Sequence, residues 1–291
     1  MRVAVIGAQG FIGRHLCDAL AMRRIDVLPL SSRNSDLFDP ATGVLTDRLP
    51  ADSAIDALVY LSQSPHYRDM PRDAAHLWGV NVTSAIRAVN WARRAGARRI
   101  LHASTGTVYA HSFLPHREHD PVRRDDWYAL SKCHAEETLR LFADVNVTSM
   151  RLFGVFGPQQ RGKLVPNLAA AILAGRDIHL QAHPASSSDR NGFLMSVTYI
   201  DDAVAVMLKL LEDGGPHVLN VAGPEVVSIR GIATALGERL GIAPVFAVDA
   251  EPRRFDLIAD NTLASEMLGG RFTAVAGGLD ATVAELRTAG A

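Results

Sequence analysis

Residues 3–13 read Val-Ala-Val-Ile-Gly-Ala-Gln-Gly-Phe-Ile-Gly, and this stretch decides the fold. Its first four residues form a continuous apolar run, which is typical of a strand buried on both faces of a sheet. Three glycines follow at Gly7, Gly10 and Gly13, and apolar residues then recur at helical spacing. A strand, a glycine-rich turn and a helix in this order predict a site for a dinucleotide pyrophosphate, because a helix N-terminus offers free N–H groups to phosphate.

Short apolar runs and helical segments continue to alternate through the first 150 residues. The sequence predicts further buried strands over 27–30, 57–61, 100–103 and 147–152, and helices over 81–94 and 128–142. Such alternation predicts right-handed βαβ units, and therefore an α/β fold with a Rossmann-type doubly wound parallel sheet. We expect an NAD(P)-binding domain over residues 1–162.

The pattern changes in the second half of the chain. A smaller C-terminal substrate lobe is expected over 163–291, with some segments returning to the sheet. Strands are predicted over 197–200 and 218–221, and a helix is predicted to begin after a Ser228 cap and to end at Gly241.

The composition excludes several classes of protein. The 291 residues include 30 Lys and Arg against 31 Asp and Glu, a formal net charge of −1, which gives no electrostatic reason to expect a nucleic-acid or membrane partner. Hydrophobic residues make up 48% and charged residues 21%, so a disordered chain is excluded. No apolar run reaches the roughly 20 residues that a membrane span needs. We expect a soluble, cytoplasmic protein.

No metal site is expected. Cys17 and Cys133 are isolated in the sequence. His111, His116 and His119 lack a further ligand at the spacing that zinc requires, and are interpreted as part of a solvated loop.

The end of the second predicted strand bears on the choice of cofactor. An NAD site usually has a carboxylate here for the ribose hydroxyls, but the chain has Ser31, Ser32 and Arg33. A guanidinium binds phosphate in a forked geometry, so this pattern favours the 2′-phosphate of NADP. A solvated loop arginine is the alternative, and NAD stays open.

Three side chains predict hydride-transfer chemistry. Tyr128 and Lys132 stand one helical turn apart, so that a cation can lower the pKa of a phenol that ordinarily titrates near 10. Thr105 follows the buried strand 100–103, and ligands of open α/β sheets lie beyond the carboxyl ends of strands. We therefore expect the Thr105 hydroxyl and the Tyr128 phenol in one crevice.

These elements resemble the extended short-chain dehydrogenase/reductase family, the NAD(P)-dependent epimerases and dehydratases that act on nucleotide sugars. The resemblance covers nearly the whole chain. Its motifs are matched, in family order, by Gly7, Gly10 and Gly13, by Asn81, by residues 103–109, by Tyr128 with Lys132 and Glu136, by residues 151–158 and 199–202, by Asn220, and by Leu268 with Gly269.

The resemblance implies a role for each catalytic residue and a homodimer. Tyr128 is the acid/base on a sugar hydroxyl or ketone, Thr105 hydrogen-bonds the same oxygen, and Lys132 binds the nicotinamide ribose and lowers the pKa of Tyr128. With the end of the second strand included, the expected cofactor-binding residues are Gly7, Gly10, Phe11, Ile12, Gly13, Ser31, Ser32, Arg33, Leu61, Asn81, Tyr128 and Lys132. The expected substrate contacts are Thr105, Thr107, Gly154 and Arg253.

The chain departs from the family pattern at two substrate positions. Gly154 stands where the family has a substrate-contacting asparagine, and Met195 stands where it has a phosphate-binding arginine. Arg190 is a candidate replacement for that arginine if the loop carries an insertion. Arg253 matches the family's second phosphate arginine, so one phosphate contact is expected to be kept.

Several functions remain open at this level. A sugar-nucleotide 4-ketoreductase and a 4-epimerase fit about equally well. A reductase acting on a non-nucleotide substrate and a non-catalytic dinucleotide-sensing protein are the alternatives. Thr105 is followed by Gly106 and Thr107, where the family's 4,6-dehydratases have an Asp-Glu pair, so 4,6-dehydration is not expected.

Overall fold

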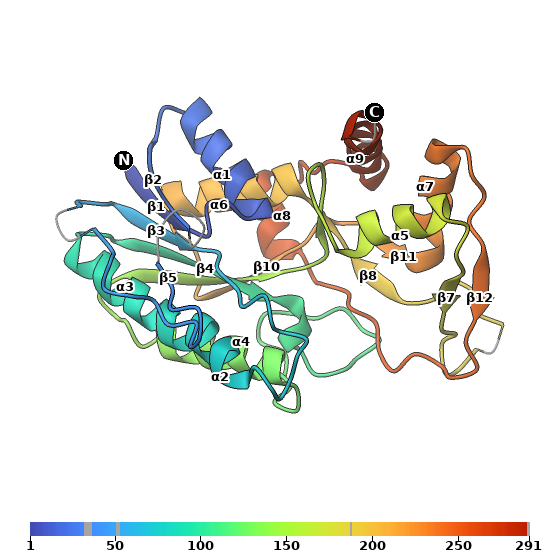
Figure 1. The fold of residues 1–291 in the computed structure, drawn as a ribbon, viewed down its shortest axis with the longest axis horizontal. Helices are drawn as coiled ribbons and strands as arrows, with labels where there is room; N and C mark the ends of the chain where they lie inside the picture. The colour runs from blue at the N-terminus through green and yellow to red at the C-terminus, as the bar shows by residue number, and fades with distance from the viewer. Residues whose placement is uncertain (32–36, 51–52, 187, 290–291) are drawn as a thin grey trace. The chain divides into compact units, whose positions relative to one another are not determined.

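A six-stranded sheet is the framework of the fold (Figure 1). In the computed structural model, which describes residues 1–31, 37–50, 53–186 and 188–289, the strand order is β10-β5-β4-β3-β1-β2. β1 pairs in parallel with β2 and with β3, and β3 pairs in parallel with β4. These pairings confirm the predicted α/β fold with a parallel sheet. The strands are β1 (Arg2–Ile6), β2 (Asp26–Leu30), β3 (Ala57–Tyr60), β4 (Arg99–Thr105), β5 (Asn146–Leu152) and β10 (Val218–Val221).

The strand order reverses at β1, because β2 lies on one side of it and β3 on the other. Ligands of doubly wound sheets bind beyond the carboxyl ends of the strands at such a point. The chain leaves β1 through the glycines at 7, 10 and 13, and the N–H of Gly7 donates to the carbonyl of Leu30 at the end of β2, at 2.9 Å. The predicted pyrophosphate site therefore lies at the reversal point.

The chain divides into two compact units, and the first contains most of the sheet. It comprises residues 1–110, 120–151 and 204–219, and the second comprises 111–119, 152–203 and 220–291. Since the chain passes between the units several times, a single boundary after residue 162 does not describe them.

Helices cover both faces of the sheet within the first unit. Figure 1 shows α3 and α4 on one face and α1 and α6 on the other. An Arg23–Glu212 hydrogen bond of 2.6 Å joins the end of α1 to α6. The helical elements are α1 (Phe11–Met22), α2 (Ala74–Trp78), the π-helical turn η1 (Gly79–Thr83), α3 (Ser84–Arg94), the 3₁₀ turn η2 (Gly106–Val108), α4 (Trp127–Leu139) and α6 (Ile200–Asp213).

The second unit has its own hydrophobic core, to which α5, α7 and α9 contribute. β8 pairs antiparallel with β11, while the pairs β7–β12 and β6–β9 are parallel. Its elements are β6 (Val155–Phe156), α5 (Leu164–Leu173), β7 (Ile178–Leu180), β8 (Leu194–Ser196), β9 (Thr198–Tyr199), β11 (Val226–Ser228), α7 (Ile229–Leu240), β12 (Phe246–Val248), α8 (Thr262–Leu268) and α9 (Val275–Ala289).

The predicted ends of α7 are confirmed, whereas one predicted strand is shorter than expected. The Ser228 hydroxyl accepts the N–H of Gly231 at 2.9 Å, and Gly241 ends the helix in the left-handed conformation. The strand predicted over 197–200 is reduced to β9, because α6 begins at Ile200. The sequence contained the signal for this helix start, since Asp201 and Asp202 place negative charge in its first turn.

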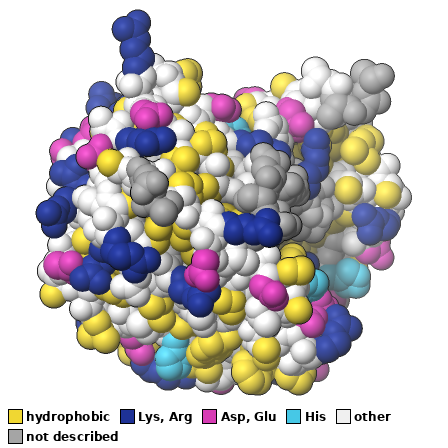
Figure 2. Space-filling model, turned by 60° about the vertical axis from the view of Figure 1, so that its left-hand side comes forward, with side chains coloured by type: hydrophobic (Ala, Val, Ile, Leu, Met, Phe, Trp, Pro, Cys, Tyr) yellow, Lys and Arg dark blue, Asp and Glu magenta, His cyan; other side chains and the backbone are white. Residues whose placement is uncertain are grey.

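The surface agrees with the balanced composition. On the face shown in Figure 2, acidic and basic side chains are interspersed. Within the part of the chain that the structure describes, no helix combines the length and the apolar character that a bilayer crossing requires.

Candidate functional site

The glycine loop, residues 7–13, is shaped to bring backbone close to a phosphate group. Gly7 has a φ of +93°, and a Cβ there would lie 3.1 Å from backbone atoms of Leu61 and Ser62. A Cβ on Gly13 would lie 2.2 Å from the carbonyl oxygen of Gly7. Phe11 and Ile12 open α1, which begins without a side-chain cap from any described residue. Its first N–H groups are thus available to an anion, and the loop fits the pyrophosphate of a dinucleotide.

The end of β2 is only partly described. The Ser31 hydroxyl donates to the side-chain oxygen of Gln9 in the glycine loop at 3.1 Å, so this serine borders the loop as expected. Ser32 and Arg33 lie outside the described residues. Their predicted contact with a 2′-phosphate stays a prediction.

The structure brings Thr105 and Tyr128 together. Thr105 is the last residue of β4, and Tyr128 lies in the first turn of α4, whose start is fixed by the Asp126 carboxylate accepting the N–H of Ala129 at 2.9 Å. The Thr105 side chain lies near enough to the Tyr128 phenol to act on its pKa. Thr107 lies beside them, with its hydroxyl 3.0 Å from that of Thr105. Two hydroxyls and a phenol therefore gather at the carboxyl end of β4.

Burial keeps the Tyr128 phenol protonated. Loss of solvent is the main cause that raises its pKa above the usual value near 10, and the charges of Tyr67 and Asp126 act in the same direction. The nearby Thr105 hydroxyl acts to lower the pKa of Tyr128, but its effect is smaller than that of burial. The lowered pKa expected from Lys132 is therefore not met in this structure. At neutral pH the phenol is a proton donor.

Lys132 lies one helical turn after Tyr128 in α4 and is buried, with 2% of its surface exposed. Its ammonium donates to the carbonyl of Ala103 in β4 at 2.9 Å. Burial lowers the pKa of Lys132 to about 8, although the nearby Glu136 carboxylate acts to raise it. Nearby charges such as that of Glu136 therefore affect the fraction of Lys132 that is protonated near physiological pH.

A buried ion pair holds α4 against the sheet. Glu136 and Arg151, in α4 and β5, are each 6% exposed, and an Arg151 Nη2 lies 2.7 Å from a Glu136 oxygen. The same carboxylate accepts a hydrogen bond from Ser104, and the Arg151 guanidinium lies over the Tyr109 ring at 4.6 Å. The family motif contains Glu136, but sequence reasoning missed that Arg151 is its partner.

Asn81 is linked to α4, the helix that carries Tyr128, by a side-chain hydrogen bond. It is fully buried in η1, and its amide nitrogen donates at 2.9 Å to Ser131, whose hydroxyl donates to the carbonyl of Tyr128 at 2.8 Å. Its side-chain oxygen finds no hydrogen-bond partner among the described residues. Leu61 follows β3, and its N–H donates to Ile6 in β1 at 2.8 Å. Cofactor contacts of Asn81 and Leu61 stay predictions.

One residue beside the phenol has no counterpart in the predicted site. The Tyr128 hydroxyl donates to the side-chain oxygen of Gln63 at 3.1 Å. Gln63 lies just beyond β3 and belongs to none of the matched motifs. Only its place after a buried strand could have indicated a position near the site.

The surroundings of Gly154, Met195 and Arg190 in the second unit bear on the predicted substrate contacts. Gly154 has a φ of +45°, and a Cβ there would lie 2.8 Å from the carbonyl oxygen of Ser196. An asparagine would therefore strain this position. Met195 is buried in β8, while Arg190 is exposed and donates to the carbonyl of Asp189 at 3.2 Å.

Arg253 is the centre of a closed ionic cluster. Its side chain is 4% exposed, and its Nε lies 2.8 Å from a carboxylate oxygen of Asp256. A second carboxylate, that of Asp189, pairs with its Nη1. Two carboxylates already surround this one guanidinium, so the predicted contact with a substrate phosphate would have to displace one of them.

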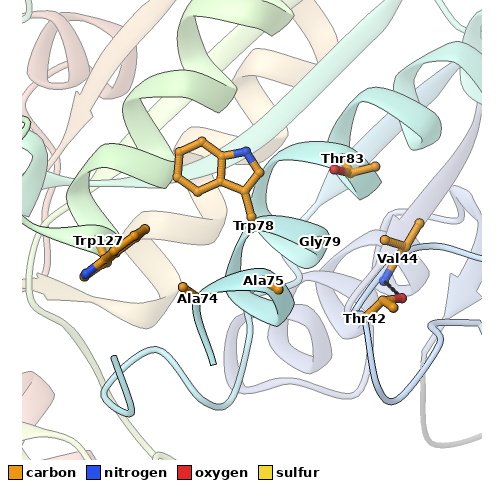
Figure 3. Close-up of a pocket in the computed structure, with 8 residues that line it drawn as sticks. All are labelled: Thr42, Val44, Ala74, Ala75, Trp78, Gly79, Thr83 and Trp127. Carbon is orange, nitrogen blue, oxygen red and sulfur yellow. Dashed lines mark hydrogen bonds between the residues drawn. The ribbon is translucent and has the colours of Figure 1, made fainter. Parts of the chain in front are cut away.

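A hollow of about 450 Å³ lies elsewhere in the first unit (Figure 3). Figure 3 shows the side chains of Trp78 and Trp127 among those that line it, and Trp127 directly precedes Tyr128. Thr105, Tyr128 and Lys132 are not among its lining residues. The lining residues are Thr42, Val44, Ala74, Ala75, Trp78, Gly79, Thr83 and Trp127.

One group of potential metal ligands occurs in the described part of the chain. His66, Asp69 and Asp73 each place a ligand atom within 4.8 Å of the others. Arg72 already lies 3.7 and 3.2 Å from the two carboxylates, so a cation balances their charge. The absence of a metal site stays a prediction.

The chain is similar to a family of known enzymes over most of its length. A family model described as the NAD dependent epimerase/dehydratase family matches residues 3–222. The chain is 29% identical to a UDP-glucose 4-epimerase of Mycolicibacterium smegmatis, over 92% of this chain and 93% of that protein. It is also 29% identical to a dTDP-4-dehydro-6-deoxy-D-allose reductase of a Streptomyces species, over 88% of each.

Solved structures share the fold. The UDP-glucose 4-epimerase of Thermus thermophilus, in complex with NAD, superposes with a TM-score of 0.80 at 23% identity, over 99% of this chain and all of that one. The NAD-dependent NDP-hexosamine 5,6-dehydratase TunA also has a TM-score of 0.80 at 23% identity, over 99% of this chain and 98% of that one. Proteins described as an epimerase and as a dehydratase therefore share this fold.

Proposed function

The chain belongs to the NAD-dependent epimerase/dehydratase family, and we propose that it transfers hydride at the C4 carbon of a sugar nucleotide, as a 4-ketoreductase or a 4-epimerase. The observation that carries this proposal is the placement of the Thr105 hydroxyl and a protonated Tyr128 phenol at the carboxyl end of β4. The two relatives that are 29% identical over most of the chain are a 4-epimerase and a sugar-nucleotide reductase, and they support the same reaction class.

The residues of the chain divide the work between binding and proton transfer. The glycine loop and the start of α1 would hold the pyrophosphate of NAD(P), and Lys132 would bind the nicotinamide ribose. The bound cofactor supplies the exchangeable hydride. In the reductive direction the Tyr128 phenol gives its proton to the ketone oxygen while Thr105 hydrogen-bonds that oxygen. In an epimerase Tyr128 would have to act first as the phenolate, taking the proton from the C4 hydroxyl and becoming the phenol. It would then return that proton to the ketone oxygen.

The test is a pair of assays on the purified full chain, after the nucleotide that co-purifies with it has been identified. UDP-glucose with NAD tests epimerisation, and a dTDP-4-keto-6-deoxyhexose with NADPH or NADH tests reduction. Retained NAD with formation of UDP-galactose supports the epimerase, and consumption of reduced cofactor supports the reductase. Absence of both activities over a panel of UDP-, dTDP- and GDP-sugars contradicts the proposal.

A first prediction concerns the cofactor. Arg33→Ala is expected to weaken NADP binding at least about tenfold and to leave NAD binding within about twofold, because only NADP has the 2′-phosphate that a guanidinium would bind. Fluorescence titration with NADPH and NADH measures both affinities. Equal losses for the two cofactors would show that Arg33 plays no part in selection, and the preference for NADP would be wrong.

A second prediction excludes 4,6-dehydration, even though a dehydratase shares the fold. That reaction needs an acid for the C6 hydroxyl and a base for the C5 proton, but Gly106 and Thr107 follow Thr105. The next carboxylate of the 103–118 segment, Glu118, accepts the N–H of Asn220 at 3.0 Å in the second unit. We expect no alkali-induced absorbance of a 4-keto-6-deoxy product from dTDP-, GDP- or UDP-hexoses. A signal at enzymatic rates would show that another residue performs the elimination.

The surroundings of Arg253 and the presence of Met195 favour a second candidate function. With its guanidinium held by Asp189 and Asp256, and with Met195 in place of the other arginine, the chain suits a reductase whose substrate is not a nucleotide. Reduction of 4-keto sugars that lack a nucleotide would favour it. The homodimer and the cytoplasmic location stay predictions.

A further inference from the structure

The segment after β3, residues 61–67, connects the glycine loop to the catalytic phenol. At one end, a Cβ on Gly7 would lie 3.1 Å from backbone atoms of Leu61 and Ser62. Farther along, the Tyr128 hydroxyl donates to the side-chain oxygen of Gln63 at 3.1 Å. Gln63 thus lies one residue beyond the glycine-loop contact and touches the atom that would exchange a proton.

This segment is fixed in place around Gln63. Ser64 is 1% exposed, and its hydroxyl lies 2.9 Å from Nδ1 of His76 in α2 while accepting the N–H of His66 at 3.2 Å. At the far end the Tyr67 ring packs against the Tyr128 ring, with 5.4 Å between ring centroids. The chain that follows Gln63 is therefore anchored beside the phenol.

We propose that Gln63 is the positioning residue of Tyr128, its side-chain amide accepting a hydrogen bond from the phenol and donating one to the phenolate. An amide has a carbonyl acceptor and an N–H₂ donor at nearly the same reach, and a half-turn of the side-chain amide exchanges them. The proton transfer of the proposed function breaks the O–H bond of Tyr128 and forms one on the substrate oxygen, leaving a phenolate. The Gln63 amide can therefore hydrogen-bond both the phenol and the phenolate. A carboxylate can accept a hydrogen bond from the phenol but cannot donate one to the phenolate, and an alkyl chain can do neither.

The first experiment does not depend on turnover, and so separates this proposal from the proposed function on which it rests. Protein labelled at the tyrosine ring carbon that bears oxygen is studied by NMR at pH 7, and the Tyr128 resonance is assigned by its loss in Tyr128→Phe. Gln63→Leu keeps the bulk of the side chain and removes the hydrogen bond, so we expect that resonance to shift. An unmoved resonance would overturn the proposal whatever the protein catalyses.

The second experiment uses pH profiles of the full-length enzyme. Gln63→Glu places a carboxylate beside the phenol, and its negative charge disfavours the phenolate. The limb of the kcat–pH profile that reports ionisation of Tyr128 should therefore move to higher pH by about one unit or more. Gln63→Leu should lower kcat about tenfold and leave KM within about threefold, since it removes one hydrogen bond from an atom that reacts. Gln159→Glu adds the same charge at an exposed glutamine of the second unit and should leave the limb in place.

Equal behaviour of the leucine and glutamate variants, with no displacement of the limb, would show that Gln63 only fills space. The wild-type chain could turn over none of the tested sugar nucleotides while the Tyr128 resonance still shifts in Gln63→Leu. That result would contradict the proposed function but would support the positioning of the phenol by Gln63.

Discussion

Tyr128→Phe is expected to lower turnover by roughly 100-fold or more, which is the usual scale for the loss of a general acid. The substitution removes one oxygen and keeps the ring that packs against Tyr67. Affinity for the cofactor should stay within about twofold, because the glycine loop and Lys132 are unchanged. Steady-state kinetics and cofactor titration measure the two effects separately.

The matched control for this variant is Tyr199→Phe. Tyr199 is also half-buried, but it lies in β9 of the second unit, where its ring contacts Phe156. We expect turnover of this variant to stay within about twofold of the wild type. Full activity of Tyr128→Phe, or an equal loss in both variants, would contradict the acid role of Tyr128.

The fold could be predicted from the sequence because it depends on local signals. Continuous apolar runs indicate buried strands, and the glycines at 7, 10 and 13 are required where a Cβ would meet neighbouring backbone. The capping serine at 228 and the glycine at 241 act within one turn of their helix, so they too are visible in the sequence.

The parts of the site that sequence reasoning missed all depend on contacts between distant segments. Gln63 reaches Tyr128 over 65 positions, and the Arg253–Asp189 pair spans 64. No local pattern marks such a partner, because any surface glutamine or aspartate would look the same in the sequence. The motif predicts a family position for Arg253, but the charge around that residue depends on its contact with the distant Asp189.

The same limit applies to the pKa of Tyr128. The spacing alone places Lys132 one helical turn from Tyr128, and this predicts a lowered pKa for the phenol. In the structure the pKa of the phenol is raised, mainly by burial. The ammonium of Lys132 donates to the carbonyl of Ala103. Whether burial or a nearby charge has the larger effect on the pKa depends on how far solvent reaches both groups, which sequence spacing does not specify.

Glu136→Gln is expected to destabilise the fold by about 3–5 kcal/mol, because it leaves the guanidinium of Arg151 buried without a compensating charge. Both side chains of this pair are 6% exposed, so water cannot replace the lost partner. Urea unfolding followed by circular dichroism measures the change. The adjacent Glu137 provides the control in the same helix, because its ion pair with Arg124 has side chains that are 49% and 58% exposed. Glu137→Gln should cost less than about 1 kcal/mol.

The same substitution should also change how the protein binds its cofactor as the pH rises. The Glu136 carboxylate acts to raise the pKa of Lys132, which burial has lowered to about 8. Without that carboxylate the pKa of Lys132 falls further, so the ammonium loses its proton at a lower pH than in the wild type. If Lys132 binds the nicotinamide ribose through its charge, the affinity of Glu136→Gln for NAD(P) should begin to decline below pH 8, while Glu137→Gln follows the wild type. Identical pH dependence in the two variants would show that Glu136 acts on stability alone, and that the buried ion pair and the catalytic ammonium are independent.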